Sequence, residues 1–566
     1  MRTWYYVGPH EHQPESWHEQ RLLNIGQGTI SVDTETISLV DKTCIGVGLG
    51  LSSSEAYYFT VLPAMSSLFR QAIQLVGRQD ICKLYHNANY DIQVLRELAA
   101  VDKQCPDPDV WNYHDTAIMA QVSGKRAALE FVGAEVGIED LFSVQDVLDE
   151  ARVRLGKQKV NMLDADQDLV ALKCMNDVRA TWAIYDYLTE GNEKLQYRQL
   201  DVYEVDRYCL SILKTVERKG FAVDHDALNK HYDRLSREVV QLNDICQQHG
   251  FSASHPQQVG YILALRGNIL PFTKTRRQLK TDDETLSKLD DPLAHLVLAY
   301  RKSSKLLSTY VRPWLTADRA YTHFRLDLST GRLASYDRNQ QNIPPLMRDI
   351  FDADSGSFTW ADISQLEMRV FAEWSQDPLM LRAYRSGKSI HKITQEGLWP
   401  GELTEDTYGR SKTFNFAMIY DAQVKTLAER TGLPETAASV YRSSWLNLYN
   451  VAAAAMDEAM AADVDVVEDF YGRRMLLPEV TLNEYGRSNQ GHVNKCKVNY
   501  PIQGTGASIV KRGINYLWGH GYGDAYRLQV HDEHVLDGDV EWPVELDYLC
   551  DRVATPHEVK RGSKWY

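Results

Sequence analysis

The chain has 566 residues, of which 44% are hydrophobic and 25% charged, and at roughly 100–200 residues per domain it should form about three to five compact units. This length excludes a peptide hormone and a lone binding module, and the absence of an internal repeat excludes a fibrous protein. Lysine and arginine number 62 against 77 aspartates and glutamates, a net charge of −15, which counts against a nucleic-acid partner unless cations gather in local patches.

The first predicted element is a strand from Gly28, where the segment GTISVDTETISLV alternates with a two-residue period, and β-rich runs follow at CIGVGLGL and YYFTVL. Residues from about 168 to 200 are apolar at helical spacing, and we place a domain boundary near residue 200, where the sequence becomes charged. The section from 225 to about 315 is predicted to be helical around the loop FTKTRRQLKTDD. The last third mixes helices with short strands and tight turns.

The eight cysteines are scattered, and no two of them form a C-x-x-C pair. Neither a zinc knuckle nor a disulfide framework is therefore predicted. The N-terminus lacks the basic start and apolar core of a signal peptide, and no run approaches about 18 apolar residues. We expect a cytoplasmic protein without membrane contact.

The opening strand carries two carboxylates, Asp33 and Glu35, which at positions i and i+2 project to the same face. Because an acid-x-acid triplet is common by chance, a solvated strand face is the alternative. The segment HNANYDIQVL adds Asp91 on a predicted helix, and the helix near residue 177 adds Asp177 among apolar residues, where an unpaired carboxylate would be costly to bury. These four acids could share divalent cations.

The order D-x-E, then N-x-x-x-D, then a late helical aspartate resembles the DEDD family of 3′→5′ proofreading exonucleases. The resemblance implies an RNase H-like α/β domain, a mixed sheet flanked by helices, in which Asp33, Glu35, Asp91 and Asp177 hold two Mg²⁺ ions, with Mn²⁺ as a possible substitute. Where the family has a tyrosine four residues before the last aspartate, this chain has Lys173. An i, i+4 ion pair with Asp177 competes with a water-orienting role. The resemblance implies 3′→5′ proofreading activity, with a disabled exonuclease as the alternative.

Two further acidic sites lie in the second half. In FTWADISQLEMRVFAEWSQD a strand-like run ends at Asp362 and a helix begins, with Glu367 one turn along. In YRLQVHDEHVLDG the residues His531, Asp532 and Glu533 lie where one β-run turns into another, which predicts the tip of a hairpin. An exposed hairpin would carry polar residues in any case, so this segment alone decides nothing.

Between these segments, KTFNFAMIY places Lys412, Phe416 and Tyr420 at i, i+4 and i+8, on one face of a predicted helix. An aromatic stripe of this kind is more often part of a core than of a site. A lysine that continues the stripe is unexpected in a core, and this favours a binding face.

These three segments together resemble motifs A, B and C of the family A DNA polymerases, which include bacterial DNA polymerase I and several phage replicases. Four further blocks occur in the family's order: RKSSKLLSTY (301–310), TGRLASYDRNQQNIPP (330–345), FYGRRMLLP (470–478) and NYPIQGTGASIVKR (499–512). The resemblance covers nearly the whole chain. It implies an exonuclease domain over residues 1–200 and an α+β right-hand polymerase domain over 201–566, with the thumb at about 225–320, the palm at about 321–375 and 490–566, and the fingers at about 376–489.

The implied activity is template-directed addition of deoxynucleotides to a primer 3′ end, with two Mg²⁺ ions held by Asp362, Asp532 and the carbonyl of Ile363. The resemblance makes Glu533 a supporting acid. The implied nucleotide-binding residues are Lys412 at the triphosphate, Phe416 at the incoming sugar, Tyr420 near the templating position, Glu367 as a steric gate against a ribose 2′-OH, and His531 near the primer or triphosphate.

Tyr408 stands where the family has a triphosphate-binding arginine. Arg410 lies about 200° around an ideal helix from Lys412. It could therefore replace that arginine only if the helix starts late, as Gly409 permits.

The implied partners are primer–template DNA and dNTPs, with a replicative helicase–primase as a further candidate, and the chain is expected to be monomeric. Arg332 and Gln503 resemble donors that test base pairs in the minor groove, and Asn342 and Asn499 belong to the same shell. Basic groups that could line a DNA groove are Lys274, Arg276, Arg277 and Lys302, with Arg473, Arg474, Lys511 and Arg512 as further clusters.

We expect no 5′-nuclease domain before Asp33, which favours a phage replicase over a cellular repair enzyme. A DNA-binding factor that keeps a polymerase fold without turnover is the alternative from another class.

Overall fold

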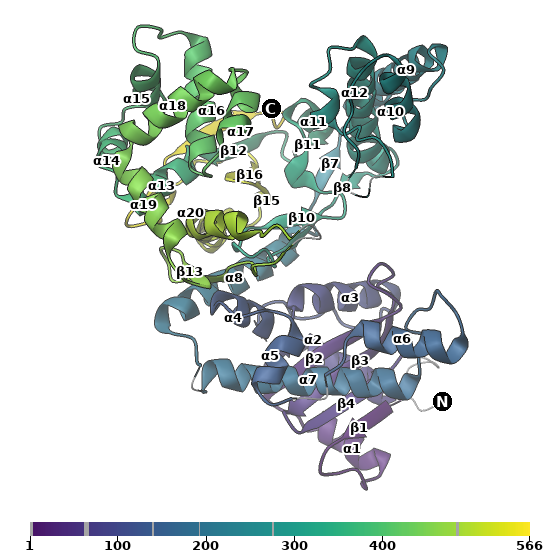
Figure 1. Ribbon diagram of the computed structural model, residues 1–566. Coiled ribbons are helices and arrows are strands. Elements are labelled where there is room, and N and C mark those ends of the chain that lie inside the picture. The colour runs from purple at the N-terminus through teal and green to yellow at the C-terminus, as the bar shows by residue number, and fades with distance from the viewer. Residues whose placement is uncertain are drawn as a thin grey trace.

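The computed structural model describes residues 4–61, 67–138, 141–191, 193–273, 275, 277–482 and 486–566. Figure 1 shows an N-terminal body at the bottom and two helical bodies above it, one on each side of a small sheet. No helix among the described residues is long and apolar enough to cross a membrane. All eight cysteines are free thiols.

The N-terminal body is built on one mixed sheet. Its strands are β1 (Trp4–Val7), β2 (Gly28–Thr36), β3 (Cys44–Ser52), β4 (Glu55–Thr60), β5 (Ile81–Tyr85) and β6 (Tyr113–Asp115). Their order is β1-β4-β3-β2-β5-β6; the first four of these pair antiparallel, whereas β2, β5 and β6 pair parallel. The mixed sheet and its flanking helices confirm the α/β fold expected for the first half.

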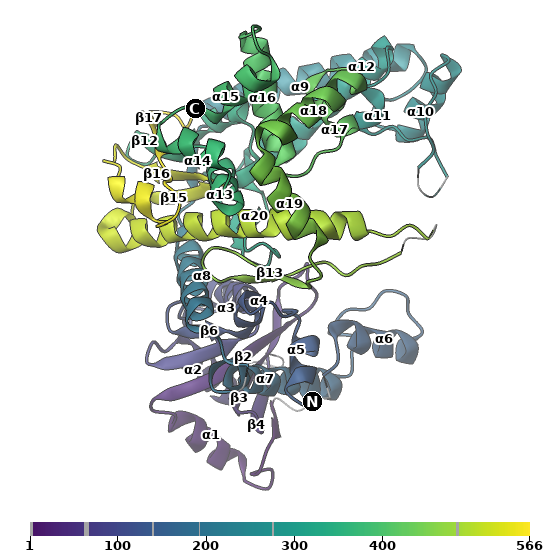
Figure 2. The ribbon, with the colours of Figure 1, turned by 60° about the vertical axis from the view of Figure 1, so that its left-hand side comes forward.

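Eight helices of the described chain belong to this body or lead out of it. They are α1 (Glu15–Leu23), α2 (Ser67–Gly77), α3 (Ala88–Val101), α4 (Thr116–Val122), α5 (Leu129–Glu135), α6 (Val144–Leu155), α7 (Gln167–Thr189) and α8 (Tyr197–Val216). Helix α8 leads from the lower body toward the upper part of the molecule in Figure 2.

The long helix α7 packs against strands β2, β3 and β4. Gly48 of β3 permits this approach, because a Cβ atom there would lie 2.6 Å from the Cys174 sulfur. Ser31 of β2 donates a hydrogen bond of 2.7 Å to the Val178 carbonyl. These contacts hold the middle of α7 against the strand that carries Asp33 and Glu35.

A second sheet, which we call the C-terminal sheet, lies between the two upper bodies. It contains β12 (Phe358–Ile363), β15 (Tyr526–Val530), β16 (Glu533–Asp537) and β17 (His557–Gly562), in the all-antiparallel order β15-β16-β12-β17. Helices α13 (Leu366–Ser375) and α20 (Gln490–Leu517) pack against each other. Figure 2 shows α20 running across the molecule, above the N-terminal body.

The two upper bodies are helical. One contains α9 (His225–Gln248), α10 (Pro256–Leu265), α11 (Asp283–Leu286) and α12 (Pro292–Lys305); the other contains α14 (Pro378–Arg385), α15 (Ile390–Leu398), α16 (Glu405–Met418), α17 (Val424–Thr431), α18 (Glu435–Leu448) and α19 (Asn450–Ala461). Short strands join the parts: β7 (Phe221–Val223), β8 (Arg319–Ala320), β9 (His323–Arg325), β10 (Ala334–Tyr336), β11 (Phe351–Asp352), β13 (Val466–Glu468) and β14 (Arg474–Leu476). This confirms the α+β arrangement expected for the second half.

A buried charge network ties α8 to α20. Asp206 accepts hydrogen bonds of 2.7 Å from both Arg473 and Lys511, and all three side chains are at most 1% exposed. Gly331 lies directly over Arg473, since a Cβ atom there would come within 2.7 Å of the guanidinium carbon. The expectation that Arg473 and Lys511 could contact phosphate is wrong, because both cations are buried and paired with Asp206.

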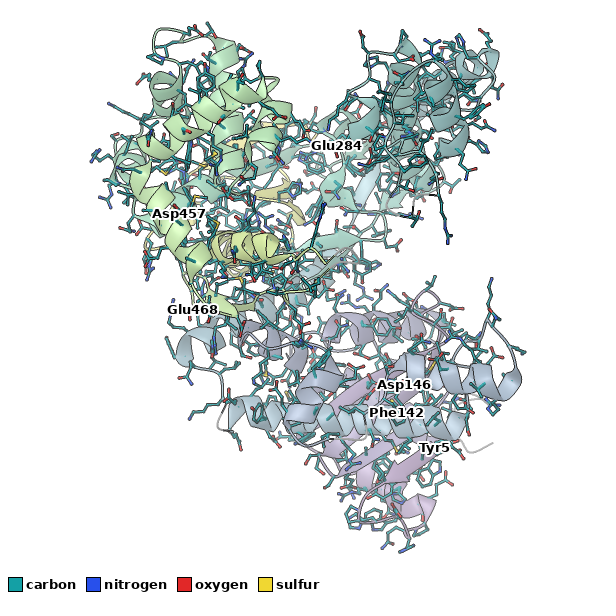
Figure 3. The ribbon with its side chains drawn as sticks, viewed as in Figure 1. Tyr5, Phe142, Asp146, Glu284, Asp457 and Glu468 are labelled. Atoms are coloured by element: carbon teal, nitrogen blue, oxygen red, sulfur yellow. The ribbon has the colours of Figure 1, made fainter. Side chains whose placement is uncertain are left out.

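The border between the halves also has an exposed ion pair. Arg198, at the start of α8, lies 2.8 Å from Glu468 of β13, which Figure 3 labels at the border between the lower and upper bodies. An exposed pair of this kind contributes little to stability, so the buried network is the stronger link.

Asp206→Asn should lower the stability of the unit that α8 and α20 form by about 3–5 kcal/mol, because it leaves buried Lys511 without a counter-charge and buried Arg473 with only Asp469, 3.9 Å away. Urea unfolding followed by far-UV circular dichroism measures the loss. The control is Asp201→Asn on the same helix, whose exposed pair with Arg512 should be worth less than about 1 kcal/mol. Equal losses in the two variants would contradict the assignment.

Candidate functional site

The strand pairing of the C-terminal sheet brings three acids to one end. Asp362 of β12 lies directly opposite Glu533 of β16 in the antiparallel register. The amide of Ile363 donates to the Asp532 carbonyl at 3.2 Å. The acids predicted at the end of a strand and at a hairpin tip are therefore neighbours, although about 170 residues separate them along the chain.

Two left-handed residues shape this end of the sheet. Gln365, with φ of 56°, ends the extended backbone after β12 and starts α13, which puts Glu367 in the first turn of that helix. His531, with φ of 53°, makes the tight turn between β15 and β16. Left-handed backbone is uncommon for residues other than glycine and often marks a functional site.

No cation of the described residues is bonded to Asp362 or Asp532; Lys560 and Arg348 act on the first, and Arg332 on the second, only from a greater distance. Burial and the nearby charge of Glu367 raise the pKa of Asp532 to about 7, and burial and Glu558 raise the pKa of Asp362. No described residue forms a hydrogen bond or ion pair with either side chain. Adjacent carboxylates without a counter-charge are the hard oxygen donors that Mg²⁺ prefers, so these residues fit a divalent-ion site.

Glu533 is held by other side chains. Its oxygens accept hydrogen bonds from Arg348 at 3.2 Å, from the Trp565 indole at 3.0 Å and from the Tyr566 hydroxyl at 3.2 Å. The Arg348 guanidinium also lies 4.2 Å and 4.6 Å from the centroids of these two rings. Glu533 is thus bonded within the protein, whereas no described side chain bonds to Asp362 or Asp532.

A cavity of about 310 Å³ opens beside Asp532. Both Arg332 and Tyr420 donate hydrogen bonds to Glu367 at its wall. Burial and the nearby Arg332 charge lower the pKa of His531, so this ring is neutral near pH 7. The cavity gathers six residues that the sequence placed in one site: Arg332, Glu367, Tyr420, Gln503, His531 and Asp532.

Helix α16 carries the predicted binding stripe only in part. Lys412 and Phe416 are both exposed on this helix, and the Lys412 ammonium lies 4.8 Å from the centroid of the Tyr408 ring. The helix ends at Met418, so Tyr420 lies in the turn beyond it and not on the same helical face. Tyr420 reaches the cavity because Asp421, with φ of 45°, turns the chain there.

The late helix start that Arg410 required does not occur. A capping box at Thr404 starts the helix at Glu405, four residues before Gly409. Arg410 then points away from Lys412 and pairs with Asp406 at 3.0 Å. The condition for a nucleotide-binding role of Arg410 is therefore not met in this structure.

The four acids of the N-terminal body also come together, and we call Asp33, Glu35, Asp91 and Asp177 the acidic cluster. Asp91 of α3 accepts hydrogen bonds from the Thr34 amide at 2.9 Å and from its hydroxyl at 2.8 Å. Burial raises the pKa of Asp91 to about 7 despite these bonds. Burial likewise raises the pKa values of the other three acids.

Lys173 lies inside the acidic cluster. Its ammonium is 2.9 Å from Glu35 and 2.6 Å from Asp177. Burial by itself would lower the pKa of Lys173, but the charges of Asp177, Glu35 and Asp33 outweigh it and hold the pKa well above its usual value. The Cys174 thiol donates to Asp33 at 3.2 Å. A protein cation thus occupies the place where the sequence predicted metal ions, and in this state the cluster does not fit a pair of divalent ions.

A second cavity, of about 720 Å³, opens beside Lys173 and Asp177. Its walls come from both halves of the chain: Lys42 and His86 belong to the N-terminal body, whereas Arg325 and Tyr336 come from the strands β9 and β10. The acidic cluster therefore faces a space that the second half helps to enclose.

Comparison with known proteins agrees with the geometry. Residues 222–547 match the family model described as DNA polymerase family A. The chain belongs to DNA polymerase family A. DNA polymerase I of Pseudomonas aeruginosa is 27% identical over 559 residues, which cover 90% of this chain and 59% of that protein. DNA polymerase I of Caldicellulosiruptor bescii is 28% identical over 402 residues, 64% of this chain and 47% of that protein. The chain thus spans about half the length of these relatives.

A solved structure shows the same fold. The POL domain of Pol1 from M. smegmatis, in complex with DNA primer-template and dNTP, superposes with a TM-score of 0.71 at 20% sequence identity, and the match covers 98% of each chain. The family A architecture expected from the motifs is therefore confirmed.

The family resemblance also named residues for DNA contact. Asn342, Arg277 and Lys302 are exposed and free to meet a strand, whereas Asn499 is half-buried and its side-chain oxygen has no hydrogen-bond partner among the described residues. Lys274 and Arg276 lie outside the described residues. These contacts stay predictions.

Other residues of the site carried no sequence signal. Gln341 donates to the Gln529 side chain at 2.6 Å and accepts from the Ser335 amide at 2.7 Å, which joins the segment after Arg332 to strand β15. Arg348, Trp565 and Tyr566 were missed as well. A glutamine or an aromatic residue in an irregular segment has no periodicity that could have marked it.

In metal-free protein, Asp532→Asn should raise stability by roughly 1–2 kcal/mol above pH 7, because wild-type protein must bury a charge there. The pKa of Asp532 is raised to about 7, so stability is present at low pH and is lost as pH rises toward 7. The gain should therefore be smallest near pH 4. Urea unfolding in EDTA at several pH values measures it, and Asp463→Asn at an exposed position is the control. A gain that does not depend on pH would refute the assignment.

Proposed function

We propose that this chain is a template-directed DNA polymerase that adds deoxynucleotides to a primer 3′ end. The observation that carries the proposal is the carboxylate pair Asp362 and Asp532, to which no described side chain is bonded, beside a cavity lined by Arg332, Glu367 and Gln503. Membership of family A supports it. So does the M. smegmatis structure of the same fold, which holds primer-template and dNTP.

In this proposal Asp362, Asp532 and the Ile363 carbonyl hold two Mg²⁺ ions, or Mn²⁺ in their place. When bound, the ions supply charge neutralisation at the attacking and leaving oxygens of nucleotidyl transfer. Glu533 does not need to ligate, because Arg348, Trp565 and Tyr566 already use its oxygens. Its role is to keep β16 and the Asp532 turn in place.

The residues around the cavity select the substrate. Glu367 lies at the wall of the cavity, where a carboxylate can exclude a 2′-OH, and Arg332 and Tyr420 fix it from two sides. Gln503 and Arg332 can donate to minor-groove acceptors that all correct base pairs share. Lys412 on the exposed face of α16 supplies a cation for the triphosphate, and Phe416 an apolar surface for the sugar.

We assign residues 1–200 to the N-terminal domain and 201–566 to the polymerase domain, with the thumb, palm and fingers bounded as the motifs predict. Primer–template DNA and dNTPs are the proposed partners. Replication of phage DNA in the host cytoplasm, by a monomer that works with a helicase–primase, is the wider setting that we propose, because family A includes phage replicases as well as bacterial DNA polymerase I.

The N-terminal domain has the sheet and the four acids of a 3′→5′ exonuclease. Of the two alternatives left open by the sequence, the position of Lys173 between Glu35 and Asp177 favours the disabled site. We therefore propose extension without proofreading hydrolysis as the activity of this chain.

Asp362→Asn and Asp532→Asn should each reduce primer extension by roughly 10³-fold or more, a loss of about 4 kcal/mol of transition-state stabilisation. DNA binding should persist, since neither residue contacts the duplex backbone in the proposal. Extension of a labelled primer–template with Mg²⁺ and dNTPs measures the first quantity and fluorescence anisotropy the second. The control is Asp463→Asn. If the wild-type chain binds DNA and never extends it, the alternative of a structural DNA-binding factor stands.

Glu367→Ala should lower the preference for dNTP over rNTP at least about tenfold, because it removes the carboxylate that excludes the 2′-OH. Extension itself should also slow, since Arg332 and Tyr420 lose a shared acceptor. Single-nucleotide kcat/KM values for both substrates measure the ratio. Glu373→Ala, on the same helix α13, should leave the ratio unchanged, and an unchanged ratio in Glu367→Ala would reject the gate.

A further inference from the structure

The chain contains two sets of gathered carboxylates, and the protein treats them differently. In the C-terminal sheet, no side chain of the described residues bonds to Asp362 or Asp532. In the acidic cluster, an ammonium group lies between two of the four acids. Among the described residues, the first set has cations nearby but none bonded to it, whereas the second contains a bonded cation.

The geometry of Lys173 is that of an interior counter-ion. Its Nζ atom lies 2.9 Å from a Glu35 oxygen and 2.6 Å from an Asp177 oxygen, and the three side chains are at most 9% exposed. Exposed i, i+4 pairs on helices contribute little. A buried ammonium shared by two carboxylates from different elements is instead part of the folded core, because removal of one partner leaves an unpaired buried charge.

The other two acids also accept hydrogen bonds from the protein, each at one of its two oxygens. One Asp91 oxygen accepts from the Thr34 amide and hydroxyl, and one Asp33 oxygen accepts from the Cys174 thiol. Each acid of the acidic cluster therefore has a donor from the chain itself. A divalent ion at Glu35 and Asp177 would have to expel the Lys173 ammonium, since two cations cannot share that position.

The backbone keeps Lys173 in this place. Helix α7 is drawn close to the sheet at Gly48, which touches Cys174, the residue after Lys173. Because the lysine and Asp177 are four residues apart on one helix, their side chains lie on the same face, directly opposite Glu35 of β2. The packing that brings the four acids together thus also inserts the ammonium among them.

We propose that Lys173 is the resident cation of the acidic cluster, takes the position of a divalent ion between Glu35 and Asp177, and makes this site stable without metal. The proposal rests on the assignment of the N-terminal domain to an exonuclease fold, and it is independent of the polymerase activity. It makes the identity of residue 173 the element that decides whether the cluster binds metal.

Metal binding tests this directly. The full chain carries Asp362→Asn and Asp532→Asn, so that the C-terminal sheet no longer contributes a metal site, and Mn²⁺ is titrated by electron paramagnetic resonance. With Lys173 present, the acidic cluster should bind Mn²⁺ weakly. Lys173→Met should raise the affinity at least about tenfold, and Asp33→Ala added to Lys173→Met should remove the gain. Equal Mn²⁺ affinity with and without Lys173 would overturn the proposal.

A matched control distinguishes an effect of the Lys173 ammonium at its own position from an effect of positive charge anywhere in the cavity. Lys42 lines the same cavity as Lys173, but its ammonium donates to the Gln93 amide oxygen at 2.6 Å and not to the acidic cluster. Lys42→Met removes the same charge from the same cavity. It should leave Mn²⁺ affinity within about twofold of the parent, and a gain equal to that of Lys173→Met would show that bulk electrostatics is responsible.

The stability of the Lys173 variants is a second measurement, and it does not depend on enzymatic activity. Lys173→Met leaves Glu35 and Asp177 without a counter-charge, so its unfolding midpoint should fall in EDTA and recover with Mn²⁺, whereas the parent should be insensitive to both. If Lys173→Met does not fold, Lys173→Met combined with Asp177→Asn removes one buried charge, and its midpoint should again depend on Mn²⁺ more than that of the parent. A parent that Mn²⁺ stabilises as strongly would contradict the proposal.

Degradation of single-stranded DNA is the last test of the proposal. The chain with Asp362 and Asp532 intact should not degrade the 3′ end of a labelled single strand in Mg²⁺ without dNTPs. Degradation that Asp33→Ala abolishes would overturn the proposal, because hydrolysis at that site requires the metal ions that Lys173 is proposed to exclude. Failure of primer extension would leave this result unaffected, so the two proposals fail separately.

Discussion

The pairing of β12 with β16 is the constraint on which the proposed polymerase site depends. It sets Asp362 against Glu533 in register, and the bond from the Ile363 amide to the Asp532 carbonyl fixes the turn that carries the second acid. A shift of the register by one residue would turn every side chain of the strand to the opposite face of the sheet. Backbone hydrogen bonds thus bring together two carboxylates that would repel each other.

The two carboxylate sets differ in whether a described side chain supplies a bonded cation. Burial and the nearby charge of Glu367 raise the pKa of Asp532 to about 7. The charged form of this carboxylate therefore destabilises the folded protein when no ligand is bound. In the acidic cluster the corresponding cost is offset inside the protein by Lys173.

The fold was predictable where hydrophobic period and turn residues agree. The strand ending at Asp362, the hairpin around Asp532 and the helix carrying Asp177 all follow the pattern of the sequence. The end of α16 did not, because Tyr420 continues the i, i+4 spacing while the left-handed Asp421 already turns the chain. The sequence left the start of α16 open at Gly409, and the capping box at Thr404 sets it at Glu405.

The residues of the site were less predictable where their bonding partners lie far away in the sequence. Arg473 and Lys511 stand in basic clusters of the sequence, but both are buried on Asp206, a residue more than 260 positions away from either. Trp565 and Tyr566 reach Glu533 from the end of an irregular segment. Contacts of this range depend on tertiary packing, which leaves no periodic trace in a single sequence.

The order of the C-terminal sheet also has a consequence for synthesis. Both neighbours of β12, namely β16 and β17, come from residues beyond 530. At about 5–20 residues per second, β12 therefore waits roughly 10–30 s as an unpaired apolar strand before its partners leave the ribosome. The nascent chain has a long interval in which this strand can pair wrongly, and chaperone demand should be greatest then.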